Sequence, residues 1–112
     1  MKTGLLILSL VTTTVAAASV QPAQAPDGKA LYNENCRKCH GVIGTPPKTM
    51  KEKFPKIATF NGEFIASHSQ DSIVKVLTHG KNADMKSFKD KLKPDEMQAV
   101  AVYVHDLGAK SH

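Results

Sequence analysis

The chain has 112 residues, no tryptophan and an aromatic content of 5%, which limits it to one domain with a modest hydrophobic core. Fifteen basic and ten acidic side chains give a net charge of +5, and this mild excess does not predict a nucleic-acid partner. A small domain of this composition usually needs a disulfide, a metal or another bound group to stabilise it.

The first segment is typical of a secretory signal peptide. Lys2 precedes an apolar stretch that begins at Leu5, and an A-x-A sequence ends at Ala25. The stretch is shorter than the roughly 20 apolar residues that span a bilayer, so we predict cleavage rather than stable membrane insertion. Cleavage after Ala25 is the favoured prediction, and cleavage after Ala18 is the alternative.

Cleavage after Ala25 divides the chain into a signal peptide, residues 1–25, and one domain, residues 26–112. Export would place this domain in the periplasm. No strand pattern longer than a few residues and no internal repeat occurs in the sequence, so we predict an all-α fold.

The first predicted helix covers residues 27–38, with Asp27 near its N-cap. It contains most of a Cys-x-x-Cys-His sequence formed by Cys36, Cys39 and His40, which is typical of a covalent haem attachment site. On a helical turn the two sulfur atoms lie on one face, where they can bind two vinyl groups of a porphyrin. His40 then places its imidazole under the ring as an axial ligand of the iron.

Other uses of the two cysteines fit less well. A zinc site would need more ligands, and His68 and His79 do not follow a usual zinc spacing. A thioredoxin-like disulfide would need a surrounding βαβ pattern, and a structural disulfide would close too short a loop to add much stability. The sequence therefore favours one covalent haem c, with its iron.

Shorter elements follow the haem motif. Residues 44–47 contain glycine and two prolines and break the helix. Short helical segments are predicted over residues 50–54 and 63–67, and the second of them is expected to point Phe64 and Ile65 inward.

A longer helix is predicted over residues 71–78. Ser69 or Asp71 can cap its beginning, and Gly80 can end it. Its apolar residues recur at helical spacing and are expected to be buried, namely Ile73, Val76 and Leu77.

The last predicted helix begins at Pro94, a residue that is favoured at the first helical position. Lys93 is a poor N-cap, and Gly108 is expected to end the helix. Apolar residues again recur at helical spacing, namely Met97, Val100, Ala101, Val104 and Leu107.

The iron also needs a ligand on the ring face opposite His40, which requires a loop that is distant in sequence. The methionine and histidine candidates are Met50, Met85, Met97, His68, His79, His105 and His112. Met97 fits the core of the last helix better than a loop. Met85 lies in a polar, basic loop, where a methionine has no evident packing role. We therefore predict Met85 as the ligand, with His79 and Met50 as alternatives.

The order of haem motif, methionine loop and terminal helix resembles that of the class I cytochromes c. The resemblance covers most of the predicted domain, in residues 28–41, 79–88 and 92–104. It implies the cytochrome c fold, with three main helices and short helical turns wrapped around one covalently attached haem. It differs from the four-helix haem proteins, whose attachment motif lies near the C-terminus.

The resemblance also implies roles for particular residues. Gly28 matches the small residue at which the first and last helices cross, and Tyr103 matches the aromatic residue packed there. In the family a proline carbonyl accepts a hydrogen bond from the axial histidine, and Pro46 or Pro47 would provide it here. The family often has proline directly after the axial methionine, whereas this chain has Lys86.

The resemblance implies a soluble, monomeric electron carrier rather than an enzyme, with protein redox partners. One alternative is a haem subunit of a larger oxidoreductase complex. Another is a peroxidase-like or gas-binding protein with a displaceable sixth ligand, although no distal His–Arg pair is evident. The lysine-rich residues 48–56 match no feature of the family. Other basic residues would steer the carrier to acidic docking surfaces, namely Arg37, Lys38, Lys75, Lys81, Lys86, Lys89, Lys91 and Lys93.

Overall fold

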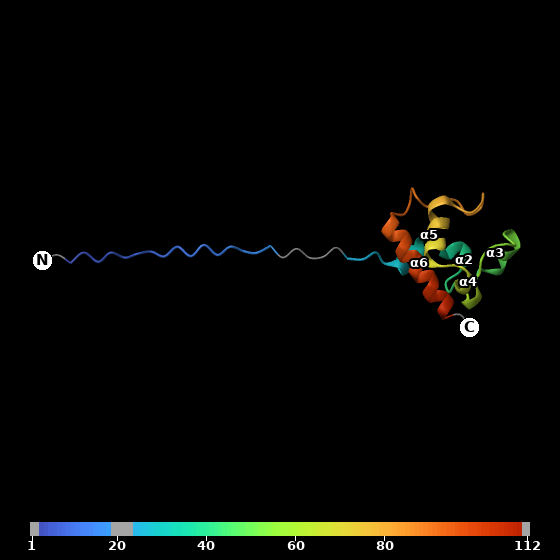
Figure 1. The fold of residues 1–112 in the computed structure, drawn as a ribbon, viewed down its shortest axis with the longest axis horizontal. Helices are drawn as coiled ribbons and strands as arrows, with labels where there is room; N and C mark the ends of the chain where they lie inside the picture. Colours follow the sequence, from blue (N-terminus) through green and yellow to red (C-terminus); the bar gives the residue numbers. More distant parts are fainter. Residues whose placement is uncertain (1–2, 19–23, 111–112) are drawn as a thin grey trace.

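The computed structural model describes residues 3–18 and 24–110. Within these ranges the protein contains helices and no strand, which confirms the predicted all-α class (Figure 1). The helices are α1 (Gly28–Asn35), α2 (Arg37–His40), α3 (Lys48–Lys53), α4 (Gly62–Ser67), α5 (Gln70–His79) and α6 (Pro94–Ala109).

The C-terminal helix α6 is the element against which the others pack. Helices α1, α4 and α5 all contact it, and the core lies along these contacts. The predicted apolar face of α6 is confirmed, because Met97, Val100 and Val104 are each at most 3% exposed. In α5, Ile73 and Leu77 are buried as predicted, whereas Val76 is only half-buried.

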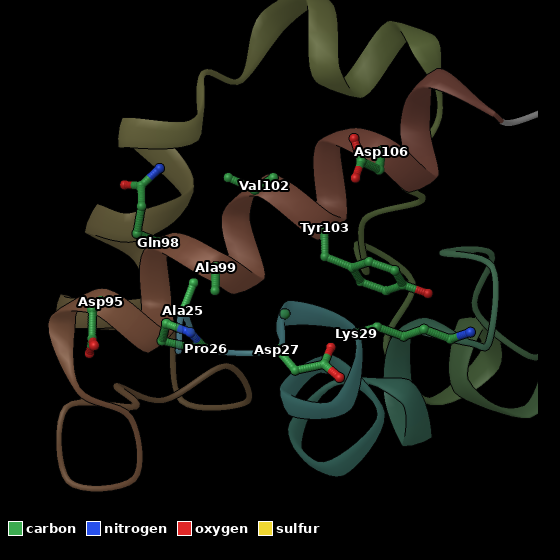
Figure 2. Close-up of a pocket in the computed structure, with 11 residues that line it drawn as sticks. Ala25, Pro26, Asp27, Lys29, Asp95, Gln98, Ala99, Val102, Tyr103 and Asp106 are labelled. Carbon is green, nitrogen blue, oxygen red and sulfur yellow. The ribbon is translucent and has the colours of Figure 1, made fainter. Parts of the chain in front are cut away.

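The crossing of α1 and α6 requires a glycine. A Cβ added at Gly28 would overlap the carbonyl oxygen of Ala99 and lie 2.8 Å from its carbonyl carbon. It would also lie 3.3 Å from the Cβ of Tyr103, and Figure 2 shows Ala99 and Tyr103 on the side of α6 that faces the start of α1. The roles expected for Gly28 and Tyr103 are therefore confirmed.

Side-chain caps fix where several helices begin. The Asp27 carboxylate accepts a hydrogen bond from the Ala30 amide at 3.1 Å, which confirms the predicted cap of α1. Ser69 accepts from the Ser72 amide at 3.1 Å, so Ser69 rather than Asp71 caps α5. The short helix α4 begins after Asn61, whose side chain accepts from the Phe64 amide.

The C-terminal helix does not stop at Gly108, contrary to the prediction. Helix α6 continues to Ala109, and the φ of Gly108 is not positive. A Cβ at Gly108 would overlap the side chain of Ile65 and lie 3.0 Å from the Asn61 carbonyl oxygen. The glycine is therefore needed for the close approach of α4 to α6, and not as a helix C-cap.

The N-terminal segment lies apart from the helical domain. Residues 3–18 form an extended chain without secondary structure that projects away from the helices (Figure 1). Its apolar side chains, from Leu5 to Val15, are 79–94% exposed. Among the described residues, no helix is long and apolar enough to cross a membrane.

Candidate functional site

The Cys-x-x-Cys-His motif lies on the short helix α2, directly after a bend in the chain. Helix α1 ends at Asn35, and Cys36 has a φ of −121° that separates it from α2. Cys36 is buried and Cys39 is half-buried, and both are free thiols. His40, the last residue of α2, is also buried. The three predicted haem-binding residues of the motif therefore share one turn of chain.

A backbone carbonyl far along the chain orients the His40 ring. The Nδ1 atom of His40 lies 3.2 Å from the carbonyl oxygen of Ala58. A carbonyl oxygen can only accept, so Nδ1 carries the proton and Nε2 is the ring nitrogen with a free lone pair. The expectation that Pro46 or Pro47 would accept this bond is wrong. The acceptor is instead Ala58, which follows those prolines in the chain and places its carbonyl oxygen beside the His40 ring.

Phe60 packs against the same histidine. The rings of His40 and Phe60 are stacked, with centroids 4.6 Å apart and an interplanar angle of 19°. The Phe60 amide donates to the Gly44 carbonyl at 2.8 Å, which ties the returning chain to the segment after the motif. Gly44 has a φ of 84°, and a Cβ there would lie 2.8 Å from the Cβ of Phe60. Sequence reasoning missed Phe60 because no periodic pattern contains it.

Tyr32 supports the other side of the motif. Its side chain is completely buried, and its hydroxyl donates a hydrogen bond of 2.7 Å to the carbonyl oxygen of Gly41. Its ring also contacts Phe60 edge-on, with centroids 6.3 Å apart. Burial raises the pKa of Tyr32, and the neighbouring Cys36 and Tyr103 raise it further. The tyrosine is therefore a neutral hydrogen-bond donor that fixes the residue after His40.

Burial also sets the ionisation of the motif. The pKa of the Cys36 thiol is raised to about 12, first by burial and then by the charge of Cys39. Burial lowers the pKa of His40, and the hydrogen bond to Ala58 opposes this only in part. His40 is therefore neutral at pH 7, which is the form that binds a metal. Two free thiols beside one neutral imidazole form a donor set that fits haem c.

Met85 lies in a different part of the fold, in the loop between α5 and α6. It is half-buried and packs against the core. The alternative candidates occupy other places: Met50 is half-buried in α3, and His79 is exposed at the end of α5. Met97 is a core residue, 3% exposed, as predicted. His112 lies outside the described residues.

The other two described histidines, His105 in α6 and His68 at the end of α4, have partners outside the candidate site. The Nε2 atom of His105 donates to the His68 carbonyl oxygen at 2.7 Å, and the His68 ring stacks on Phe64. No group of three or more His, Cys, Asp or Glu side chains that could hold a metal ion occurs in residues 3–18 and 24–110. The zinc alternative therefore has no support from the described part of the chain.

A shallow pocket lies away from the haem motif. It has a volume of about 480 Å³ and is bounded by residues 25–29 and by one side of α6, including Asp95, Val102 and Asp106 (Figure 2). None of the predicted haem-binding residues lines it. The pocket belongs to the α1–α6 crossing and not to the candidate site.

Comparison with known proteins identifies the family of the chain. Residues 23–104 match the family model described as cytochrome c oxidase, cbb3-type, subunit III. The chain is 34% identical to cytochrome c6 of Thermosynechococcus vestitus, over 93% of this chain and 86% of that protein. The chain belongs to the class I c-type cytochromes. Cytochrome c6 of Nostoc sp. is 35% identical over 90% of this chain and 87% of that protein.

Two further matches refine the relationship of this cytochrome to others. The chain is 32% identical to the cbb3-type oxidase subunit CcoP of Azospirillum brasilense over 80% of its length, but it spans only 30% of that protein. The solved structure of the KustC0563 c-type cytochrome superposes with a TM-score of 0.65 at 32% identity, over 72% of this chain and 96% of that one. The cytochrome c fold is thereby confirmed. The family carries covalent haem c with iron, and the function of the chain is electron transfer on a c-type haem.

Proposed function

We propose that one haem c is attached through Cys36 and Cys39 and that His40 and Met85 bind its iron. The two free thiols are the groups that form thioether bonds, and the Nε2 of His40 is available because Nδ1 donates to Ala58. When bound, the haem supplies a one-electron couple between ferrous and ferric iron, and an axial methionine favours the reduced state relative to a second histidine.

The observation that carries this proposal is the way the chain holds His40. The Ala58 carbonyl fixes its tautomer, Phe60 stacks on its ring, and burial keeps it neutral. A ligand held in this way changes little in position when the iron changes oxidation state, which suits electron transfer. With His40 and Met85 both bound, no coordination site remains for a substrate. We therefore propose an electron carrier and not an enzyme.

The test of the ligand set is a comparison of Met85→Ala with Met50→Ala. Optical and magnetic-resonance spectra of the oxidised holoprotein report the sixth ligand directly. We expect Met85→Ala to lose the methionine signature and Met50→Ala to retain it. An unchanged spectrum for Met85→Ala would show that the assignment of Met85 is wrong.

A second candidate is a haem subunit of a larger oxidoreductase complex. The match to the cbb3-type subunit III family and to CcoP favours it. The proposed carrier elutes as a monomer from size-exclusion chromatography, whereas a subunit copurifies with other proteins. Affinity purification of the tagged chain from its native membrane and soluble fractions distinguishes the two.

We also propose that residues 1–25 are a signal peptide, removed after Ala25, and that residues 26–112 act in the periplasm. The support is the exposure of the apolar side chains from Leu5 to Val15, which the helical domain does not cover. Intact-mass measurement of the exported protein tests this proposal. A mass that begins at Pro26 is expected, and a mass that begins at Ser19 would favour cleavage after Ala18.

The partners are proposed to be proteins with acidic docking surfaces. The basic residues near the haem motif and the Met85 loop are all exposed, namely Arg37, Lys38, Lys75, Lys81, Lys86, Lys89, Lys91 and Lys93. Such a surface speeds association with an acidic partner at low salt. We expect the double change Lys81→Glu and Lys86→Glu to slow the bimolecular electron-transfer rate and to weaken its dependence on ionic strength.

The chain offers a matched control for this charge reversal. Helix α3 carries Lys51 and Lys53, which are also exposed, and it lies at the edge of the domain farthest from the N-terminal segment (Figure 1). Reversal of Lys51 and Lys53 changes the net charge by the same amount as reversal of Lys81 and Lys86. Equal slowing by both double variants would contradict docking at the Met85 loop.

A further inference from the structure

Hydrogen bonds join the end of the loop that carries Met85 to the last turn of α5, from which the loop starts. The Phe88 amide donates to the Leu77 carbonyl at 2.7 Å, and the Ser87 hydroxyl donates to the Thr78 carbonyl at 2.5 Å. Gly80 turns the chain out of α5 with a φ of 75°, and a Cβ there would lie 2.8 Å from the Ser87 amide nitrogen. Residues 80–87 therefore form a tight loop whose two ends touch.

Asn82 contacts the backbone on both sides of Met85, with its side chain on one side and its own amide on the other. The Oδ1 atom of Asn82 accepts from the Met85 amide at 2.9 Å and from the Asp84 amide at 3.0 Å. The Met85 carbonyl in turn accepts from the Lys81 amide at 2.8 Å and from the Asn82 amide at 3.4 Å. Asn82 thus forms a clamp, hydrogen-bonded to both the N–H and the C=O of Met85.

The Met85 loop contains no proline, whose ring would restrict the backbone. Here Lys86 follows Met85 and adds no such restriction. The stiffness of the loop must then come from hydrogen bonds within it, and the two bonds accepted by the Asn82 side chain join positions two and three residues apart.

We propose that Asn82 is the positioning residue of the Met85 ligand. The inference rests on the proposed binding of iron by Met85. Loss of the Asn82 carbonyl oxygen leaves the Met85 and Asp84 amides to water and frees the loop to open. An open loop carries Met85 away from its bound position, and the sixth coordination site then becomes accessible to an added ligand.

The test is the binding of imidazole to the oxidised holoprotein, which competes with Met85 for the iron. We expect Asn82→Ala to bind imidazole about tenfold more tightly than the unaltered protein, because the loop that holds Met85 loses both hydrogen bonds accepted by the Asn82 side chain; a tenfold change corresponds to about 1.4 kcal/mol. Asn82→Asp keeps an acceptor oxygen at the same place and should restore nearly the original affinity. Asn33→Ala, at an exposed position on α1, is the control for loss of an asparagine and should leave the affinity unchanged.

The outcomes separate failure of the clamp from failure of the ligand assignment. If Met85→Ala removes the methionine signature but Asn82→Ala binds imidazole like the unaltered protein, Asn82 has no positioning role. If Met85→Ala leaves the signature intact, the assignment of Met85 fails first. Amide hydrogen exchange gives a check that needs no variant. The Met85 amide should exchange much more slowly than an unprotected amide, and exchange at the unprotected rate would overturn the clamp.

Discussion

The replacement of Gly28 by alanine tests the helix crossing on which the domain is built. The new Cβ would overlap the Ala99 carbonyl oxygen and lie 2.8 Å from the Ala99 carbonyl carbon. Both atoms belong to the backbone of α6, so no side-chain rotation can relieve the overlap. Helices α1 and α6 must instead move apart along their whole contact, which includes the buried Tyr32 and the half-buried Tyr103.

The expected cost follows from two opposing effects. Overpacking of a tight interface costs about 1–3 kcal/mol, whereas alanine gains up to about 1 kcal/mol over glycine in helix propensity. The steric effect is larger, and we expect Gly28→Ala to lower the free energy of unfolding by about 1–2 kcal/mol. For a domain of this size each kcal/mol lowers Tm by roughly 4–8 °C.

Gly62 provides a matched control for this change. Like Gly28, it is the first residue of its helix and follows an Asx N-cap. Among the described residues, a Cβ at Gly62 would meet no atom of another segment within 4 Å. Gly62→Ala should therefore leave stability unchanged or raise it slightly. Denaturant unfolding of both holoproteins, followed by circular dichroism, makes the comparison. Equal stability of Gly28→Ala and Gly62→Ala would refute the steric argument.

Three other substitutions test single contacts. Tyr32→Phe removes the 2.7 Å hydrogen bond to the buried Gly41 carbonyl, which keeps only a 3.5 Å bond from the Gly44 amide, and should cost about 1–3 kcal/mol in denaturant unfolding. Gly108→Ala should cost less than Gly28→Ala in thermal unfolding, because its closest contact is the Ile65 side chain, which can rotate, and the nearest backbone atom, the Asn61 carbonyl oxygen, lies at 3.0 Å. Asp27→Ala removes the cap of α1 and should cost about 1 kcal/mol, measured by the same unfolding assay.

Each of these changes has a control or a contradicting result. Tyr103→Phe removes a hydroxyl that has no hydrogen-bond partner among the described residues, so it should cost much less than Tyr32→Phe. Asp27→Asn keeps the capping oxygen and should lie within a few tenths of a kcal/mol of the unaltered protein. A larger loss for Gly108→Ala than for Gly28→Ala would show that α4 cannot adjust as proposed.

Much of the site was predictable because its signals are local. The spacing of Cys36, Cys39 and His40 predicts haem attachment, because the geometry of one helical turn relates the three side chains. The cap of α1 at Asp27 and the start of α6 at Pro94 depend on backbone groups within three residues. Such features need only the nearby sequence, and the structure confirms both helix starts.

Contacts between distant segments were decided by the tertiary structure. The carbonyl that orients His40 belongs to Ala58, eighteen residues away. The segment that contains Ala58 and Phe60 packs against the His40 ring, whereas the earlier prolines do not accept its hydrogen bond. Glycine often ends a helix, yet Gly108 lies inside α6, where the close approach of α4 leaves no room for a side chain. The sequence alone predicted the haem-binding chemistry, since that prediction depends on side-chain identity and short spacing. Only the tertiary structure decided which backbone groups hold those side chains. Every residue has a backbone carbonyl, and the packing of distant segments determines which carbonyl lies within hydrogen-bond distance.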